Sequence, residues 1–420
     1  MNKRVGPLIV IALLLGVLHA SAAENWPQWR GPANDGVAAE GAYPREFSTA
    51  EDAESLVWKV ALPGRGCSTP AVWEDRIFVT CGIDGHDGVV CYDFAGKELW
   101  RQQLGPERPG KHRNGSGSNP SPVTDGKHLV VYYKSGTVAC LDLAGNVAWQ
   151  ANLQQKYGED KLWWDLATSP VLAAGNAVIQ VMNAGECYLV AFDLATGSLA
   201  WKQDRTYETP LECDQGYCSP SIYRRGGKET IVASGSDHVT GHDARTGEKL
   251  WECGGMNPNH EQMWRMIGSL VITGDAAIAP YGRGSRLLKL QLEGSGDVTE
   301  SQRLWDIDIE GSDVPTPVVS RDRIFLLVDK GRVTCLDLAT GQPLWSADLP
   351  KSRHTYYASP VLAGNTLYCA REDGVVFSCE INEGLAIVAE SNLGEQLIAT
   401  PIPIRGQLLV RGSEHLFLFR

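Results

Sequence analysis

Few residues of this chain have the types and spacing that chemistry requires. His238 and His242 are four positions apart, the spacing of a metal-binding pair on one face of a helix. The residues around them alternate with the period of a β-strand, in which four residues span about 13 Å. Two imidazoles so far apart cannot share one zinc ion, because a Zn–N bond is only about 2.1 Å long. The segment His260–Trp264 lacks the second histidine of a zinc-protease helix. We therefore predict no metal site from these histidines.

The segment Asp84–Gly88 is a further candidate, because its alternating aspartates and glycines are similar to those of a calcium loop. The equivalent points further along the chain are plain glycine turns, such as Lys134–Gly136 and Glu372–Gly374. We interpret Asp84–Gly88 as a turn of the same kind. The sequence also contains no Gly-x-Ser-x-Gly elbow and no phosphate-binding loop. We therefore assign no catalytic residue and no metal ligand.

An internal repeat supplies the elements that must position any site. The pattern small-x-Asp-x-x-Thr-Gly-x-x-x-Trp occurs around Asp193, Asp243 and Asp337, and in a form shorter by one residue around Asp93 and Asp142. It describes a strand, a tight turn closed by aspartate and glycine, and a returning strand that carries the tryptophan. Seven tryptophans recur in steps of 40 to 54 residues: Trp58, Trp100, Trp149, Trp201, Trp251, Trp305 and Trp345.

A second mark opens each unit of the repeat. It is a Ser-Pro or Thr-Pro pair, or Ser-Leu in one unit: Thr69-Pro70, Ser121-Pro122, Ser169-Pro170, Ser219-Pro220, Ser269-Leu270, Thr316-Pro317, Ser359-Pro360 and Thr400-Pro401. Proline at the first residue of a strand costs no ladder hydrogen bond. A hairpin lies between this mark and the Asp-Gly turn, so each unit has four short strands with an alternation of period two. The sequence therefore predicts an all-β fold, an eight-bladed β-propeller with four-stranded antiparallel blades.

The two ends of the repeat predict how the ring closes. After Thr400-Pro401 the sequence has room for three strands, whereas the strand around Trp58 precedes the first opening. We expect this N-terminal strand to complete the eighth blade and so remove its exposed edge. Residues 56–420 would form one propeller domain, and residues 24–55 would form an N-terminal strap against the ring.

Residues 1–23 have the features of a signal peptide. Lys3 and Arg4 precede an apolar run from Val5 to Leu18, and small residues follow around Ala22. The run is shorter than the about 20 residues of a spanning helix. We therefore expect cleavage and export to the periplasm or the extracellular space, with a retained anchor as the alternative. No other segment is long and apolar enough to span a membrane, so we expect no transmembrane segment in the mature chain.

The charge and the cysteines set further limits. The net charge of −12 disfavours nucleic acid as a partner. Of eleven cysteines, three occupy one position of the repeat that elsewhere holds Ala191 or Gly241: Cys91, Cys140 and Cys335. We expect these three to be small buried fillers, because neighbouring sheets are about 10 Å apart and a disulfide cannot bridge that distance. A local disulfide between Cys213 and Cys218 is an alternative that the sequence leaves open.

The repeat over residues 56–420 resembles the pyrroloquinoline-quinone (PQQ) repeat of the PQQ-like propellers, in which the tryptophan packs between blades. The segment Asn25–Pro32 is similar to the N-terminus of many exported bacterial members. Two branches are relevant, the quinoprotein dehydrogenases and the propeller lipoprotein of the outer-membrane β-barrel assembly machinery. The dehydrogenases use adjacent cysteines, Ca²⁺ ligands and a catalytic aspartate, and no two cysteines are adjacent here. The lipoprotein uses a lipidated cysteine after its signal, and none follows the apolar run here.

The axial mouth of the ring is where we expect a ligand. Four long segments lead from one unit into the next, at residues 105–119, 154–168, 204–217 and 254–267. Arginines, aromatic residues and acids in these and comparable places are suited to a peptide or a small polar ligand. The ligand-binding candidates are Arg65, His112, Arg113, Trp164, Asp165, Asp214, Trp264, Arg265 and Tyr357. Alternatively, these residues satisfy one another and plug the channel.

Together these features predict an exported, non-catalytic propeller of the bacterial cell envelope that binds a protein or small ligand. The absence of a complete catalytic set supports this hypothesis, and we expect no cofactor. The alternatives are a quinoprotein-like oxidoreductase that uses PQQ and a structural subunit of an envelope complex.

Overall fold

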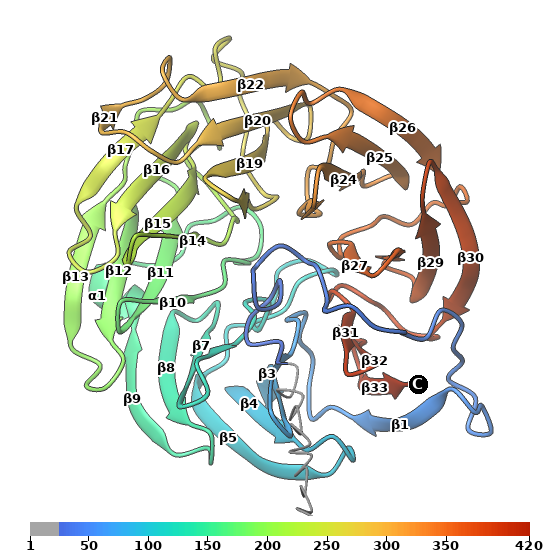
Figure 1. Ribbon diagram of the computed structural model, residues 1–420. Coiled ribbons are helices and arrows are strands. Elements are labelled where there is room, and N and C mark those ends of the chain that lie inside the picture. Colours follow the sequence, from blue (N-terminus) through green and yellow to red (C-terminus); the bar gives the residue numbers. More distant parts are fainter. Residues whose placement is uncertain (1–24) are drawn as a thin grey trace, which may run out of the picture.

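The computed structural model describes residues 25–420 and contains eight sheets arranged as a ring (Figure 1). Each sheet has four antiparallel strands that follow one another in the chain, apart from two departures described below. The predicted eight-bladed propeller is therefore confirmed. The predicted signal peptide at residues 1–23 lies outside the described residues. Within residues 25–420, no helix has the length and apolarity needed to cross a membrane.

Blades 1 to 4 fill the first half of the ring. Blade 1 contains β2 (Ala71–Trp73), β3 (Arg76–Ile83), β4 (His86–Tyr92) and β5 (Glu98–Pro106). Blade 2 contains β6 (Val123–Thr124), β7 (His128–Tyr132), β8 (Thr137–Asp142) and β9 (Val147–Asn152). Blade 3 contains β10 (Val171–Ala173), β11 (Asn176–Met182), β12 (Cys187–Asp193) and β13 (Leu199–Asp204). Blade 4 contains β14 (Ser221–Arg225), β15 (Lys228–Gly235), β16 (His238–Asp243) and β17 (Lys249–Cys253).

Blades 5 to 8 complete it. Blade 5 contains β18 (Val271–Thr273), β19 (Ala276–Tyr281), β20 (Arg286–Gln291) and β22 (Arg303–Asp308). Blade 6 contains β23 (Val318–Ser320), β24 (Arg323–Leu327), β25 (Arg332–Asp337) and β26 (Pro343–Asp348). Blade 7 contains β27 (Val361–Ala363), β28 (Thr366–Ala370), β29 (Val375–Ile381) and β30 (Leu385–Asn392). Blade 8 contains β31 (Ile402–Ile404), β32 (Gln407–Arg411), β33 (His415–Phe419) and β1 (Leu56–Ala61).

The ring closes as the sequence predicted. Strand β1 pairs antiparallel with β33, with Trp58 opposite Leu418 and Val60 opposite Leu416. The backbone N–H of Arg420 also donates to the carbonyl of Ser55 at 2.8 Å. In Figure 1 the last strand and β1 lie side by side in blade 8. The edge of β33 is thereby covered by a strand from the other end of the chain.

Two elements were not predicted. The insert between β20 and β22 contains a short strand, β21 (Gly296–Asp297), which pairs parallel with β17 of blade 4 rather than with its own blade. A five-residue helix, α1 (Leu153–Tyr157), follows blade 2 and begins where the Asn152 side chain accepts a hydrogen bond from the Gln155 N–H at 3.0 Å. Neither segment is long enough for a periodic pattern to reveal it in the sequence.

The Asp-Gly turn holds the tryptophan of the preceding blade. In blade 3, Asp193 accepts a hydrogen bond from the Thr196 N–H at 2.8 Å, and Gly197 has a φ of 69°. A side chain at Gly197 would lie 2.4 Å from the Trp149 ring of blade 2, and the Trp149 indole donates to the Leu194 carbonyl at 2.9 Å. Four other indoles make the same bond into the next blade, at 2.9 to 3.3 Å: Trp58, Trp100, Trp201 and Trp305.

The Ser/Thr that opens each unit joins the blades near the axis. Its hydroxyl accepts a hydrogen bond from the backbone N–H of the equivalent residue in the preceding blade. Seven such contacts, at 2.9 to 3.0 Å, have the hydroxyls of Thr69, Ser121, Ser169, Ser219, Ser269, Thr316 and Ser359 as acceptors. The role of proline in this motif was predicted, whereas that of the hydroxyl beside it was not. The hydroxyl is the polar group that satisfies a buried backbone donor between sheets.

Within the predicted strap of residues 24–55, residues 25–47 contact several blades. Trp26 forms a bridge with Val72 of blade 1, and Val37 forms one with Leu362 of blade 7. The buried Arg30 guanidinium donates to the carbonyls of Pro317 at 3.0 Å and Pro360 at 2.7 Å. Figure 1 shows this blue segment crossing the middle of the ring. The strap thus contacts the innermost strands of blades that are far apart around the ring.

All eleven cysteines are free thiols, so the Cys213–Cys218 disulfide is wrong. The two sulfurs bond to different groups instead. The Cys213 sulfur accepts from the Trp264 N–H at 3.3 Å, whereas the Cys218 thiol donates to the Gly268 carbonyl at 3.3 Å. Cys91 is fully buried directly opposite Trp100 on the neighbouring strand, and burial raises the pKa of its thiol to about 12. That position has to be small because the tryptophan ring lies over it.

Candidate functional site at the axial mouth

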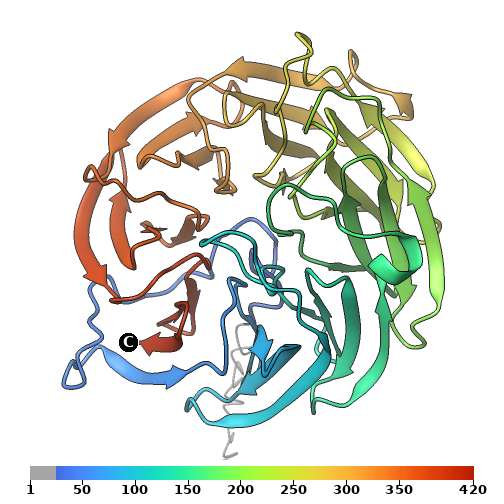
Figure 2. The same ribbon diagram turned by 180° about the vertical axis from the view of Figure 1, so that it is seen from behind.

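The long segments lie at one end of the strands, away from the strap. Each joins the outermost strand of one blade to the innermost strand of the next, so antiparallel pairing places them all at the same face. Figure 2 views the ring from this side, with helix α1 in front. The turns that the strap contacts belong to the opposite face. We name the loop-bearing opening the axial mouth.

Asp165 fastens two of these loops together. Its carboxylate accepts hydrogen bonds from the backbone N–H groups of Lys111, at 2.8 Å, and His112, at 3.0 Å, and from the Lys134 ammonium. Asp165 and Lys134 are both buried. Burial favours the neutral acid, but the hydrogen bonds from Lys134 and from the two backbone groups outweigh it and lower the pKa of Asp165. Asp165 therefore orders the loop at 105–119, and its oxygens are already occupied.

Trp164 lies against two other predicted ligand-binding candidates, His112 and Arg265. The His112 ring lies 4.3 Å from the Trp164 ring, centre to centre. The Arg265 guanidinium lies 5.8 Å from the same ring centre. These three residues come from three different loops. Trp164 still leaves 40% of its surface exposed, so a ligand can reach it.

Arg265 and Glu212 form a buried ion pair beneath this surface. The Arg265 Nη1 lies 3.2 Å from the Glu212 Oε1, and both side chains are only 7% exposed. Arg265 Nε and Nη1 and Glu212 Oε1 have no hydrogen-bond partner within the described chain. Buried polar groups without partners are rare. The two opposite charges therefore offset each other beneath the exposed surface of Trp164.

Exposed apolar side chains border this ion pair. Trp163 is 67% exposed, Leu211 69% and Met263 46%, and the Met263 N–H donates to the Leu211 carbonyl at 2.8 Å. Leu211 directly precedes Glu212, and Met263 lies two residues before Arg265. We name the four residues Trp163, Trp164, Leu211 and Met263 the apolar patch. The sequence did not single out Glu212, Leu211 or Met263, because isolated residues in aperiodic loops carry no pattern.

The remaining sequence candidates lie outside this group. Asp214 accepts from the Gly185 N–H at 2.8 Å, and the Trp264 indole donates to the Met256 carbonyl at 2.9 Å, so both hold loops in place. Arg65 donates to the Gln396 amide oxygen at 3.1 Å and to the Arg113 carbonyl.

A second charged group lies where the loop at 105–119 meets blade 7. The Arg113 guanidinium is 77% exposed and lies 3.4 Å from a Glu372 oxygen. Tyr357 is half-buried on the loop that enters the same blade. The structure thus groups His112, Trp164 and Arg265, with Asp165 bonded to the His112 backbone, and leaves the other candidates apart from them.

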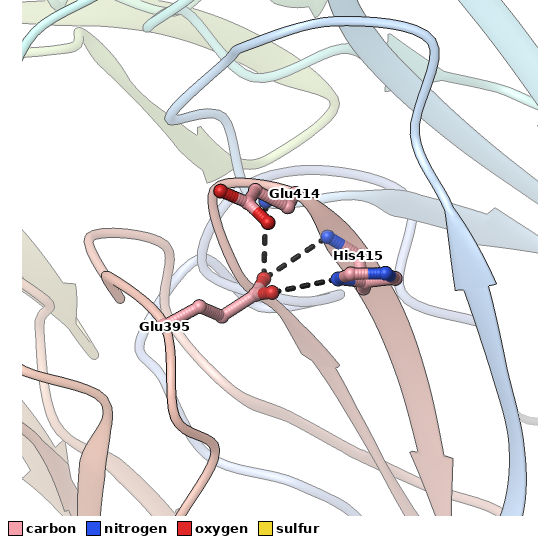
Figure 3. Close-up of side chains that lie close together, drawn as sticks. All are labelled: Glu395, Glu414 and His415. Atoms are coloured by element: carbon pink, nitrogen blue, oxygen red, sulfur yellow. Dashed lines mark hydrogen bonds and ion pairs between the residues drawn. The ribbon is translucent and has the colours of Figure 1, made fainter.

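One cluster has the composition of a metal site. The ligand atoms of Glu395, Glu414 and His415 lie within 4.8 Å of one another, as Figure 3 shows. The Glu395 carboxylate, however, accepts the backbone N–H groups of Glu414, at 3.1 Å, and His415, at 3.0 Å, and faces the His415 Nδ1 at 2.7 Å. These contacts fasten the β32–β33 turn to the loop before blade 8. We interpret the cluster as a structural contact between this turn and this loop, and we assign no metal to it.

Comparison with known proteins identifies the family. A family model described as "Outer membrane protein assembly factor BamB" matches residues 25–215 and 294–387. The chain belongs to the BamB family. The relative from Yersinia pestis is 24% identical over 321 residues, covering 76% of this chain and 65% of that protein. The relative from Escherichia coli K12 is 27% identical over 151 residues, 35% of this chain and 36% of that protein. The chain thus spans less than two thirds of these two relatives. The relative from Burkholderia pseudomallei is 24% identical, with 87% of each chain covered.

Solved structures show the same fold. BamB from Moraxella catarrhalis superimposes with a TM-score of 0.64 at 15% identity, over 87% of this chain and 99% of that one. A europium-containing methanol dehydrogenase superimposes with a TM-score of 0.71 at 10% identity, over 94% of this chain and 98% of that one. Both BamB and this methanol dehydrogenase therefore share the architecture, which confirms the resemblance expected from the repeat. At these identities the likeness concerns the fold alone.

The residues at the axial mouth do not suit PQQ. This cofactor carries three carboxylates, and the mouth already contains the buried Glu212 and the half-buried Asp313, whose pKa is raised by desolvation. The buried Arg265 faces Glu212 rather than open space. No pair of cysteines near the mouth is joined, since Cys213 and Cys218 are both free. We therefore derive no chemical step through this cofactor.

Proposed function

We propose that this protein is a non-catalytic scaffold of the cell envelope that binds a protein partner through the axial mouth. The relatives named outer membrane protein assembly factor support a role in assembling outer-membrane proteins. The features of residues 1–23 support export, because they match those of a secretory signal. A binding role needs no cofactor and no catalytic group.

The observation that carries the proposal is the apolar patch around the Arg265–Glu212 pair. Tryptophan, methionine and arginine are enriched in the centres of protein interfaces, and tryptophan and arginine dominate their binding energy. Here two exposed tryptophans and an exposed methionine lie beside the buried Arg265–Glu212 ion pair. A partner that covers the patch would exclude water from these apolar side chains. The site would thus gain energy from apolar burial.

A pull-down with matched variants tests the proposal. The triple variant Trp163→Ala, Leu211→Ala, Met263→Ala removes exposed apolar groups without touching the blades. The control, Leu344→Ala, removes an equally exposed residue, 52% accessible, from an outer strand. We expect the wild type and the control to recover the same partner in stoichiometric amount from envelope extract, and the triple variant to lose it. Equal recovery by the triple variant would overturn the proposal.

A further inference from the structure

A cavity of about 380 Å³ lies at the face opposite the axial mouth. Its walls come from three places: the turn after β23 in blade 6, the two turns of blade 7 that face it, and the strap. Its floor is apolar and is formed by Val37, Ala38, Phe325, Leu362 and Ile381. All five are buried or half-buried. The volume falls in the range of small-molecule sites, about 300 to 1,000 Å³.

Small residues at one repeat position leave room between the blades. The third residue after the Pro mark is Trp73 in blade 1 and Tyr223 in blade 4, whereas it is Ser320 in blade 6 and alanine in blades 3 and 7. The Trp73 ring fills the gap between blades 1 and 2, where a side chain at Gly126 would lie 2.3 Å from it. Tyr223 spans the next gap in its own part of the ring, with its hydroxyl donating to Asp275 at 2.8 Å. Ser320 leaves the corresponding space between blades 6 and 7 unfilled by the chain.

The entrance of the cavity is polar and carries a negative excess. Glu40, Asp322 and Glu383 are exposed there. Of the two arginines, Arg321 pairs with Glu40 at 3.2 Å. Arg323 donates to the Asn382 carbonyl at 2.7 Å, which ties the two blades together. With Glu40 paired to Arg321, the carboxylates of Asp322 and Glu383 exceed the remaining guanidinium of Arg323 by one negative charge.

We propose that this cavity, between blades 6 and 7 and the strap, binds a small flat ring that carries a positive charge, that is, an aromatic amine. The ring would occupy the place that Trp73 fills between blades 1 and 2 and would contact Phe325 and Ile381. The ammonium group would remain at the entrance beside Asp322 and Glu383. This site is independent of the axial mouth, because its walls belong to the opposite ends of the strands.

Calorimetric titration with tryptamine tests the site, and indole-3-acetate serves as the probe with the same ring and the opposite charge. We expect tryptamine to bind the full-length protein with one site per chain and indole-3-acetate to bind at least about fivefold more weakly, since each exposed charge contributes modestly. The surface variant Asp322→Asn, Glu383→Gln should weaken tryptamine about two- to fivefold. The control Glu300→Gln, exposed in the blade 5 insert, should bind like the wild type.

Ser320→Trp supplies the ring that blade 1 has at this position and should abolish tryptamine binding while the far-ultraviolet circular dichroism stays unchanged. If this variant does not fold, the double surface variant carries the test alone. Absence of tryptamine binding by the wild type, equal binding of both probes, or wild-type affinity in a folded Ser320→Trp would overturn the proposal.

Discussion

The hydroxyl of Thr69 accepts a hydrogen bond from the backbone N–H of Thr400 at 3.0 Å. The two residues are the first and last Ser/Thr marks of the repeat, so this bond joins blade 8 to blade 1 near the axis. The pairing of β1 with β33 joins the same ends at the rim. Two contacts thus close the ring: the pairing of β1 with β33 at the rim, and the hydrogen bond between Thr69 and Thr400 near the axis.

Removing the Thr69 hydroxyl should weaken this closure. Thr69→Val keeps the shape of the side chain but leaves the buried Thr400 N–H without a partner, so we expect a loss of about 1–3 kcal/mol in the free energy of unfolding. Urea unfolding followed by circular dichroism measures it. Ser301→Ala, at an exposed position of the blade 5 insert, is the control and should change stability little. An unchanged midpoint for Thr69→Val would contradict the role assigned to the hydroxyl.

The tryptophan side chains between blades should contribute different amounts to the free energy of unfolding, because not every indole N–H has a hydrogen-bond partner. The Trp149 indole donates to Leu194, whereas the buried Trp345 Nε1 has no partner within the described chain. We expect Trp149→Phe to cost about 1 kcal/mol more than Trp345→Phe, because only the first loses a hydrogen bond. Blade 7 lacks the consensus turn that would accept the Trp345 bond. The same urea titration measures both variants. Equal losses of unfolding free energy would show that packing alone, and not the hydrogen bond, determines the contribution of each tryptophan to stability.

A buried acid should make stability depend on pH. Burial raises the pKa of Asp87 to about 7 from its usual 3.8, and Ser135 donates to its carboxylate. The folded state therefore keeps a proton that the unfolded state has lost, and stability falls as pH rises from about 4 to about 7. Asp87→Asn removes this slope, which is about 1 kcal/mol per pH unit at most. The difference in unfolding free energy between Asp87→Asn and the wild type should thus increase between about pH 5 and about pH 8. A constant difference would contradict the assignment.

The Asp165–Lys134 pair should control the order of the loop at 105–119. Lys134→Met leaves the buried Asp165 without its cation, which typically costs about 3–5 kcal/mol. We expect faster hydrogen exchange at the amides of Lys111 and His112, which donate to Asp165. The double variant Lys134→Met, Asp165→Asn removes the uncompensated charge and should recover part of the protection. Unchanged exchange in Lys134→Met would show that the loop is held by other contacts.

Repeated features were predictable from the sequence, and single ones were not. The tryptophans and the Ser/Thr-Pro marks recur in phase, so they indicated eight blades and the closure by the strand around Trp58. The hydroxyl of each mark bonds a residue 43 to 52 positions away, or 331 positions away for Thr69, which no local pattern encodes. Strand β21 is only two residues long and pairs outside its own blade.

The residues of the axial mouth were likewise only partly predictable, because they do not repeat. His112, Trp164 and Arg265 were predicted because charged and aromatic residues are conspicuous in long loops. Asp214 was predicted as a candidate rather than Glu212 two residues earlier, since only the folded loop decides which of the two turns toward Arg265. Leu211 and Met263 are single apolar residues in polar loops, and their exposure is a property of the tertiary structure alone.

Site-specific photo-crosslinking in intact cells tests the central claim, that the axial mouth binds a protein partner. A photoreactive phenylalanine replaces Trp163 at the mouth, Leu344 on the outer rim or Arg321 on the opposite face in three separate variants. We expect one defined crosslinked species from position 163 and none from the other two. Crosslinks from position 344 or 321 but not from 163 would place the partner elsewhere and contradict the account.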